Sequence, residues 1–124
     1  TEICGLLLGR RGVNGDRVEG ILPAGNVAAD PARQFELDPV ILLAAHRQTR
    51  AGGYAVLGHY HSHPSGVSEP SACDAQMAHE DGALWLIVAP PDYAMWRAGA
   101  GGVHGRFRRE NISALPDQEQ DALA

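Results

Sequence analysis

The most informative stretch of this chain is residues 54–64, which read YAVLGHYHSHP. Residues 54–61 are apolar, aromatic or β-branched enough to predict a short β-strand. Side chains alternate between the two faces of a strand, so His61 and His63 fall on the same side. Both imidazole rings can then reach one point near the end of the strand.

A second short motif follows after a loop that Pro64, Gly66 and Pro70 interrupt. Ser71 then opens a run of Ala, Cys, Asp, Gln and Met that predicts the start of a helix. Asp74 falls in the first turn of that helix, where its carboxylate can face back toward the strand. Two imidazoles and one carboxylate form a ligand set for catalytic zinc, which takes three protein ligands and leaves the fourth tetrahedral position to water. The sequence therefore predicts a metal site and favours a hydrolase.

Simpler interpretations of these residues remain open. Ser71-x-x-Asp74 after a proline is also an ordinary helix N-terminus, with Ser71 as the cap and Asp74 favoured by the helix dipole. The two interpretations are compatible, because Ser71 can serve both. A single histidine on a strand is more often a hydrogen-bonded polar residue than a ligand. His59 shares the predicted face with His61 and His63 but lies further down the strand, so it is the less favoured candidate for a third histidine ligand.

Together the motifs resemble the JAMM (JAB1/MPN/Mov34) metalloprotease family, and in particular its small prokaryotic members. That family combines His-Ser-His-Pro and Ser-x-x-Asp with a glutamate on an early strand, and residues 2–9, which read EICGLLLG, are similar to that segment. Residues 34–39 and the lead-in Gly58-x-Tyr60 are also similar. The resemblance runs from Glu2 to about Trp96. It implies an α+β fold with a curved mixed β-sheet flanked by helices, layered like the cytidine deaminases.

The resemblance also implies a role for each motif residue. The metal ligands, for one Zn²⁺ per chain, would be His61, His63 and Asp74. Glu2 would act as the general base, and Ser71 would donate a hydrogen bond to the developing oxyanion. Glu69 in the loop and Glu36 near the predicted helix start are the alternative bases.

A substrate class follows from the same resemblance. The family cleaves amide bonds after the C-terminal tail of ubiquitin-like proteins, and its small prokaryotic members are linked to ubiquitin-like sulfur carriers. An extended Gly-Gly tail could lie against a sheet edge, beside a narrow channel that admits only glycine. We therefore expect a zinc-dependent (iso)peptidase acting after such a tail. The alternatives are a metal-free MPN-type scaffold that binds partner proteins, and a RadC-like JAB-domain protein.

Composition and charge agree with one compact enzyme domain. The charged fraction of 20% and the hydrophobic fraction of 44% are ordinary for a globular protein. A net charge of −5 argues against a nucleic-acid surface, and a solvated strand end explains the basic run at residues 106–109. No run of about 18 apolar residues is present, so no membrane span is expected. Cys4 and Cys73 form no disulfide framework, and an acidic chain without a visible secretory leader predicts a cytoplasmic protein.

The remaining sequence predicts the scaffold. Residues 3–10 and 17–23 predict a hairpin around the turn at 12–15. A short strand near 33–37 leads into a helix over 38–51, with Asp38 at its N-cap and Pro39 in its first turn. The other expected elements are a helix over 71–81 and strands near 84–89, 94–98 and 103–108. Runs of strands with few helices indicate an α+β domain over residues 1–112, and residues 113–124 read as an acidic, frayed tail.

Overall fold

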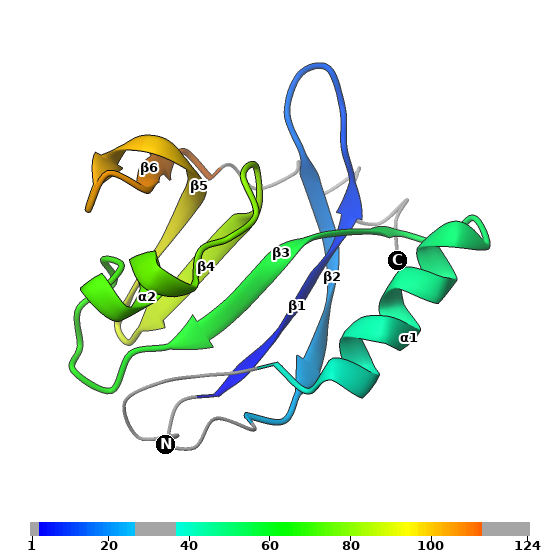
Figure 1. Cartoon of the computed structure of the whole chain (residues 1–124), viewed down its shortest axis with the longest axis horizontal. Coiled ribbons are helices and arrows are strands. Elements are labelled where there is room, and N and C mark those ends of the chain that lie inside the picture. Colours follow the sequence, from blue (N-terminus) through cyan, green and yellow to red (C-terminus); the bar gives the residue numbers. More distant parts are fainter. Residues whose placement is uncertain (1–2, 27–36, 113–124) are drawn as a thin grey trace.

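The computed structural model describes residues 3–26 and 37–112, which form one open mixed β-sheet with helices packed on it (Figure 1). The strands are β1 (Cys4–Arg10), β2 (Arg17–Ala24), β3 (Ala55–Ser62), β4 (Leu84–Ala89), β5 (Asp92–Val103) and β6 (Phe107–Glu110). The helices are α1 (Pro39–Arg50) and α2 (Ala72–Met77). The strand order is β2-β1-β3-β4-β5-β6, and β3 and β4 are the parallel pair. This is the α+β mixed sheet that the sequence predicts.

The β1–β2 hairpin and α1 form where the sequence predicts them. Gly15, in the turn, has φ 120°, a conformation that glycine adopts without a steric penalty. Asp38 caps α1, and its side chain accepts a hydrogen bond from the N–H of Val40 at 2.9 Å. The strand expected near residues 33–37 lies almost wholly outside the described residues, and only Leu37 is described, in an isolated bridge to Asn26.

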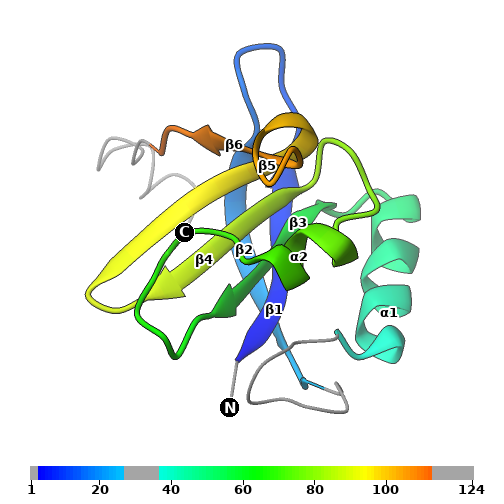
Figure 2. The same cartoon turned by 60° about the vertical axis from the view of Figure 1, so that its left-hand side comes forward.

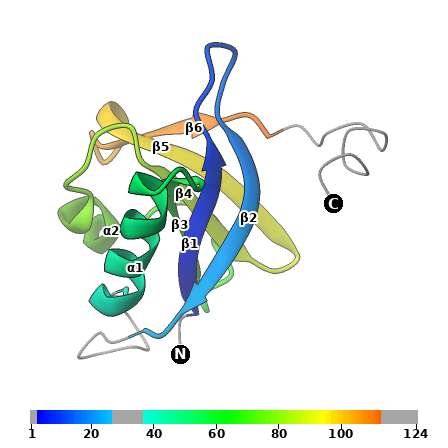
Figure 3. The same ribbon diagram turned by 90° about the vertical axis from the view of Figure 1, so that its right-hand side faces the viewer.

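Both helices lie on the same face of the sheet (Figures 2 and 3). α1 connects β2 to β3, and these two strands lie on opposite sides of β1 in the sheet. α2 connects β3 to the neighbouring parallel strand β4. Right-handed crossovers that advance in the same direction across a sheet place their helices on one face. Because α2 is the next element after β3, it lies near the end of β3 that carries the histidines. Neither helix has the length and apolar character that spanning a membrane requires.

α2 is shorter than the helix predicted over residues 71–81. It ends at Met77, and Ala78 leaves the helical conformation at ψ 82°. The guanidinium of Arg106 donates to the Ala78 carbonyl at 2.7 Å, and the Gly82 N–H pairs with Ala98 as the chain enters β4. The helix end is therefore fixed by residues distant in sequence, which a local pattern does not reveal.

The last two strands also differ from the prediction. β5 continues to Val103 instead of ending near residue 98, and β6 begins at Phe107 instead of near 103. Gly101 and Gly102 have φ of 91° and 70°, and the β5–β6 register shifts between Ala98 and Val103. These glycines bend one strand as a bulge does, rather than ending it. The turn consequently falls at residues 104–106.

An aromatic core supports β3 and β4 beneath the site. Trp85 and Phe107 are buried with their rings edge to face, at a centroid separation of 4.9 Å. Trp96 and Ile87 belong to the same buried cluster, and Ala75 and Met77 pack against it from α2. Buried aromatic pairs of this kind add to the free energy of burial. The buried ring of Trp85 in turn contacts the rings of His59 and His61 on β3.

Candidate metal centre

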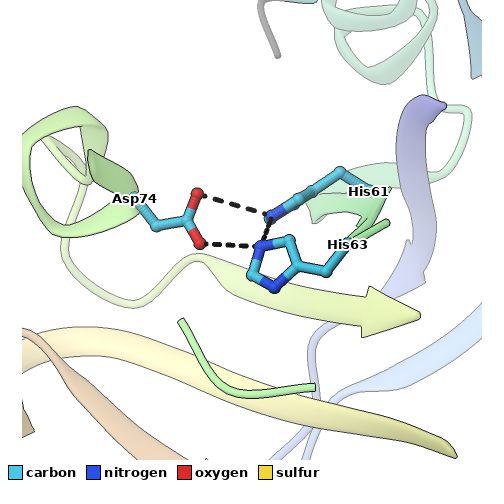
Figure 4. A group of neighbouring side chains, drawn as sticks. All are labelled: His61, His63 and Asp74. Carbon is cyan, nitrogen blue, oxygen red and sulfur yellow. Dashed lines mark hydrogen bonds and ion pairs between the residues drawn. The ribbon is translucent and has the colours of Figure 1, made fainter. Parts of the chain in front are cut away.

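Three side chains converge where β3 ends and α2 begins (Figure 4). They are His61, His63 and Asp74. The two histidine Nε2 atoms lie 3.0 Å apart, Asp74 Oδ1 lies 3.5 Å from His61 Nε2, and Asp74 Oδ2 lies 3.1 Å from His63 Nε2. Within residues 3–26 and 37–112, this is the only group of three His, Cys, Asp or Glu side chains arranged to share a metal ion.

The position of β3 inside the sheet explains why these histidines are held firmly. His61 pairs with Cys4 on β1 and with Ile87 on β4, and its side chain is fully buried. The N–H of His63 donates to the Val88 carbonyl at 2.9 Å, which extends the pairing beyond the end of β3. The alternation predicted from the sequence then brings both rings to one side.

A backbone carbonyl sets the tautomer of His63. Its Nδ1 lies 2.8 Å from the oxygen of Val67, and a carbonyl oxygen can only accept, so Nδ1 carries a hydrogen. In the neutral ring Nε2 then presents a lone pair toward Asp74 Oδ2, which is also an acceptor. Two acceptors 3.1 Å apart require a proton or a cation between them. The hydrogen bond from Nδ1 to Val67, on the other side of the ring, is the outer hydrogen bond that metal-binding histidines usually make.

The three side chains lie close enough together to share one metal ion. With metal–ligand distances of about 2.0–2.2 Å, two ligand atoms of a tetrahedral zinc site lie about 3.4 Å apart. The two histidine nitrogens lie 3.0 Å apart, and Asp74 presents a different oxygen to each of them, Oδ1 at 3.5 Å and Oδ2 at 3.1 Å. With one ligand atom taken from each residue, the three atoms lie within 4.8 Å of one another, which leaves them in reach of one ion. Imidazole nitrogen and carboxylate oxygen are ligand types of catalytic zinc sites. The three residues can therefore hold a metal ion with one coordination position left for water or substrate.

Asp74 is both part of this group and part of a helix cap. Burial alone would raise the pKa of Asp74, but hydrogen bonds with His61 and His63 and from the backbone of Ser71 lower it below its usual range. The Ser71 N–H donates to Asp74 Oδ2 at 2.9 Å, and the Asp74 N–H donates to Ser71 Oγ at 3.0 Å. This reciprocal pair is a capping box. The cap expected from the sequence is therefore present, and it coexists with the converged site.

His59 lies outside the group. Its ring packs edge-on against Trp85 at 4.2 Å and lies 5.9 Å from the ring of His61. Burial, followed by repulsion from His61, lowers the pKa of His59 to about 3, so the ring is neutral at pH 7. The structure thus gives no support to His59 as a third histidine ligand.

The other predicted site residues are placed differently. Glu2 and Glu36 lie outside the described residues. Glu69 is exposed in the loop and does not belong to the group, whereas Ser71 is exposed next to it as the N-cap of α2. Cys73 is partly exposed on α2 as a free thiol.

The sequence did not reveal that side chains of the β5–β6 hairpin bind the loop before α2. Trp96 Nε1 donates to Ser68 O at 2.9 Å, and His104 Nε2 lies 3.0 Å from Pro70 O. The available signal was His104 itself, a bulky residue in the glycine-rich run at 101–105.

Comparison with known proteins gives relatives of one kind. The model of the family "Prokaryotic homologs of the JAB domain" matches residues 1–99. The chain is 36% identical over 90 residues to the desampylase of Haloferax volcanii, covering 73% of this chain and 63% of that protein. It is 38% identical over 77 residues to the probable TtuB-protein conjugate cleaving protease of Thermus thermophilus, covering 62% of this chain and 49% of that protein. The chain thus spans less than two thirds of the length of these curated relatives.

Solved structures agree with the sequence relatives. A solution structure of a Desulfitobacterium hafniense protein matches with a TM-score of 0.75 at 30% identity, covering 91% of this chain and 77% of that one. A solution structure of a Salinibacter ruber protein matches with a TM-score of 0.65 at 31% identity, covering 94% and 79%. With the family match over residues 1–99, these likenesses cover all three side chains of the site. The chain therefore belongs to the prokaryotic homologs of the JAB domain, the branch of the JAMM family that its motifs resemble.

Proposed function

We propose that this chain is a zinc-dependent isopeptidase that hydrolyses the amide bond after the C-terminal Gly-Gly tail of a ubiquitin-like or sulfur-carrier protein. The observation that carries this proposal is the convergence of His61, His63 and Asp74 at the end of a buried strand in a JAB-domain protein. The relatives support it by name, since one is a desampylase and the other a probable protease for TtuB-protein conjugates.

In this proposal His61, His63 and Asp74 hold the zinc ion, whose chemistry is to acidify water and to polarise a carbonyl. The protein prepares these ligands in advance. Asp74 is held as a carboxylate by its hydrogen bonds, and the carbonyl of Val67 directs the Nε2 lone pair of His63 toward the group. Little rearrangement is then needed when the metal binds.

We assign Glu2 as the general base. Its neighbour Ile3 is fixed beside the site, because the Ile3 N–H donates to Ser62 Oγ at 2.8 Å and the Ser62 N–H donates to the Ile3 carbonyl at 2.9 Å. Ser62 stands between the two histidines in sequence. A carboxylate delivered from this segment could take a proton from the attacking water and return it to the leaving amine.

Ser71 can be both a cap and an oxyanion donor. A serine hydroxyl has one hydrogen to donate and two lone pairs to accept with. The cap uses an acceptor site, because the N–H of Asp74 donates to Ser71 Oγ. The hydroxyl hydrogen is left for a substrate oxygen, where such a donor stabilises the developing negative charge.

The pairing of β3 limits how the substrate tail can approach. β3 is hydrogen-bonded to β1 and β4 on its two sides, and the outer strands of the sheet are β2 and β6. In the part of the chain that the structure describes, neither of these outer strands carries a residue of the site. We propose instead that the tail runs along the exposed loop at residues 64–67. Glycine would suit the position next to the attacked carbonyl, since it has no Cβ to keep the backbone away from the loop.

The test is hydrolysis of a ubiquitin-like sulfur carrier fused, directly after Gly-Gly, to a reporter. Wild-type protein loaded with zinc should release the reporter, and His61→Ala should lose both zinc and turnover. His46→Ala removes an exposed histidine from α1 and should keep both. Glu2→Gln should keep zinc but lose turnover, because an amide cannot accept the water proton.

A carrier ending in Gly-Ala should be cut much more slowly than the Gly-Gly carrier. Equal rates on both carriers and on casein-like peptides would indicate a broad peptidase and end the substrate assignment. Absence of zinc uptake by the wild type would instead support the non-catalytic scaffold.

A further inference from the structure

The β5–β6 hairpin holds the segment that carries Ser71 and Asp74. Each contact joins a side chain of the hairpin to a backbone carbonyl before or after α2. The contacts are Trp96 Nε1 to Ser68 O (2.9 Å), His104 Nε2 to Pro70 O (3.0 Å) and Arg106 Nη2 to Ala78 O (2.7 Å). A helix as short as α2 is not stable by itself, so contacts at both of its ends help to fix it.

The contact of His104 differs from the other two, because it is made to a peptide group that also serves Asp74. The carbonyl of Pro70 accepts from His104 Nε2. The N–H of Ser71, in the same peptide unit, donates to Asp74 Oδ2 at 2.9 Å. A peptide unit is planar, so fixing the direction of its C=O also fixes the direction of its N–H. Hydrogen bonds at both ends of one peptide also polarise and strengthen each other.

The backbone at His104 indicates that its side chain is needed there. His104 has φ 52°, and among residues 3–26 and 37–112 it is the only residue other than glycine with a positive φ. Gly102, two residues before it, and Gly105, directly after it, have φ of 70° and 69°. Glycine adopts this left-handed region freely, whereas a residue with a Cβ does so at a cost. The turn thus accepts an unfavourable conformation at the one position whose side chain reaches Pro70.

We propose that His104 is a positioning residue for the metal centre. It holds the Pro70–Ser71 peptide so that the Ser71 N–H fixes one oxygen of the Asp74 carboxylate and prevents the carboxylate from rotating. The inference rests on the proposed function, because it takes Asp74 as a metal ligand. Residue 104 lies beyond residues 1–99, which the family model matches.

The test is the zinc affinity of purified apo-protein, measured by competition with a chromophoric chelator, together with the melting temperature of the apo-protein. His104→Gly removes the donor and allows the same backbone conformation. We expect affinity for Zn²⁺ to fall about 10-fold, the lower end of the usual range for outer hydrogen-bond partners of metal ligands. The melting temperature should change little, because relief of the left-handed conformation offsets the lost hydrogen bond to Pro70.

Two further variants complete the test. His104→Gln carries an amide N–H that can reach the Pro70 carbonyl, and it should restore most of the affinity. His79→Gln changes an exposed histidine outside these contacts and should have wild-type affinity. The visible spectrum of the Co²⁺-substituted protein should change in His104→Gly and remain unchanged in His79→Gln.

The outcomes separate this inference from the function on which it rests. Unchanged zinc affinity in His104→Gly, with a wild type that binds zinc, would overturn the positioning role alone. A parallel loss of affinity and melting temperature would show a general structural role and also overturn it. A wild type that takes up no zinc would overturn the proposed function and this inference together.

Discussion

At the scale of single residues, main-chain groups of the loop orient the side chains of the site. The carbonyl of Val67 directs His63, and the N–H of Ser71 directs Asp74. Both are only three or four residues from the side chain that they orient. Residues 63–74 therefore contain two of the three candidate metal ligands and the main-chain groups that orient them. This locality is also why His61, His63 and Asp74 could be selected from sequence, through strand alternation and a first-turn acidic residue.

The two roles of Ser71 can be separated by substitution. Ser71→Ala removes the oxygen that accepts from Asp74, which should destabilise the protein by about 1 kcal/mol and lower the melting temperature by roughly 3–6 °C. If the hydroxyl also donates to the oxyanion, kcat should fall on the order of 10²–10³. Ser71→Thr keeps both functions of the hydroxyl and is the control. A lowered melting temperature with a near-normal kcat would leave Ser71 as a cap only.

At the scale of elements, boundaries set by local chemistry match the prediction and those set by distant partners do not. Asp38 and Ser71 cap α1 and α2 through their own following residues, so both helix starts could be read from sequence. The end of α2 depends on Arg106, which is 28 residues from Ala78. The glycines after Ala98 predict the end of a strand, but β5 continues through them because its pairing with β6 resumes at Val103. Such pairing is not visible in a local pattern.

β3 and β4 approach each other closely at Gly58, and this contact can be tested. A Cβ built on Gly58 would lie 1.9 Å from the backbone oxygen of Leu84, with which Gly58 pairs. Because the neighbour is backbone, it cannot move away without breaking the pairing. Gly58→Ala should therefore cost on the order of 3 kcal/mol in the free energy of unfolding, measured by urea denaturation of the apo-protein.

Gly20→Ala is the matched control for that substitution. Gly20 also lies in a strand, β2, but nothing is within 4 Å of a Cβ placed on it. This variant should differ from wild type by no more than about 0.5 kcal/mol. A similarly small effect for Gly58→Ala would mean that the sheet accommodates a Cβ at this position, which would contradict the close approach of β3 and β4 there.

At the scale of the whole molecule, contacts between distant segments join the β1–β2 connection to the last two strands. Arg97 on β5 donates to Asp16, in the β1–β2 connection, at 2.9 Å across 81 residues of sequence, and it also pairs with Glu110 on β6. The overall sheet class could be predicted from the order of strands and helices. The contact of His104 with the loop before α2 could not, because His104 lies beyond the glycine bend in β5.

The candidate metal site joins the end of β3 to the start of α2, so metal binding should stabilise the whole fold. The donors come together only in the folded chain, and a ligand that binds only that state stabilises it by RT ln(1 + [L]/Kd). At free zinc about 100 times its Kd, this amounts to about 2.7 kcal/mol, or roughly 8–16 °C in melting temperature. A chelator should remove this increment and added Zn²⁺ should restore it. Mg²⁺ should not restore it, because Mg²⁺ prefers octahedral oxygen ligands.

The same increment should disappear in a variant that lacks one of the three ligands. Asp74→Asn replaces one of the three ligands, so the zinc-loaded and chelated forms of this variant should melt at nearly the same temperature. Differential scanning calorimetry of the wild type and of Asp74→Asn, each with zinc and with chelator, gives these melting temperatures. Equal melting temperatures for zinc-loaded and chelated wild type at pH 7.5 would mean that the three side chains form only a hydrogen-bonded cluster, and the zinc mechanism would then fail.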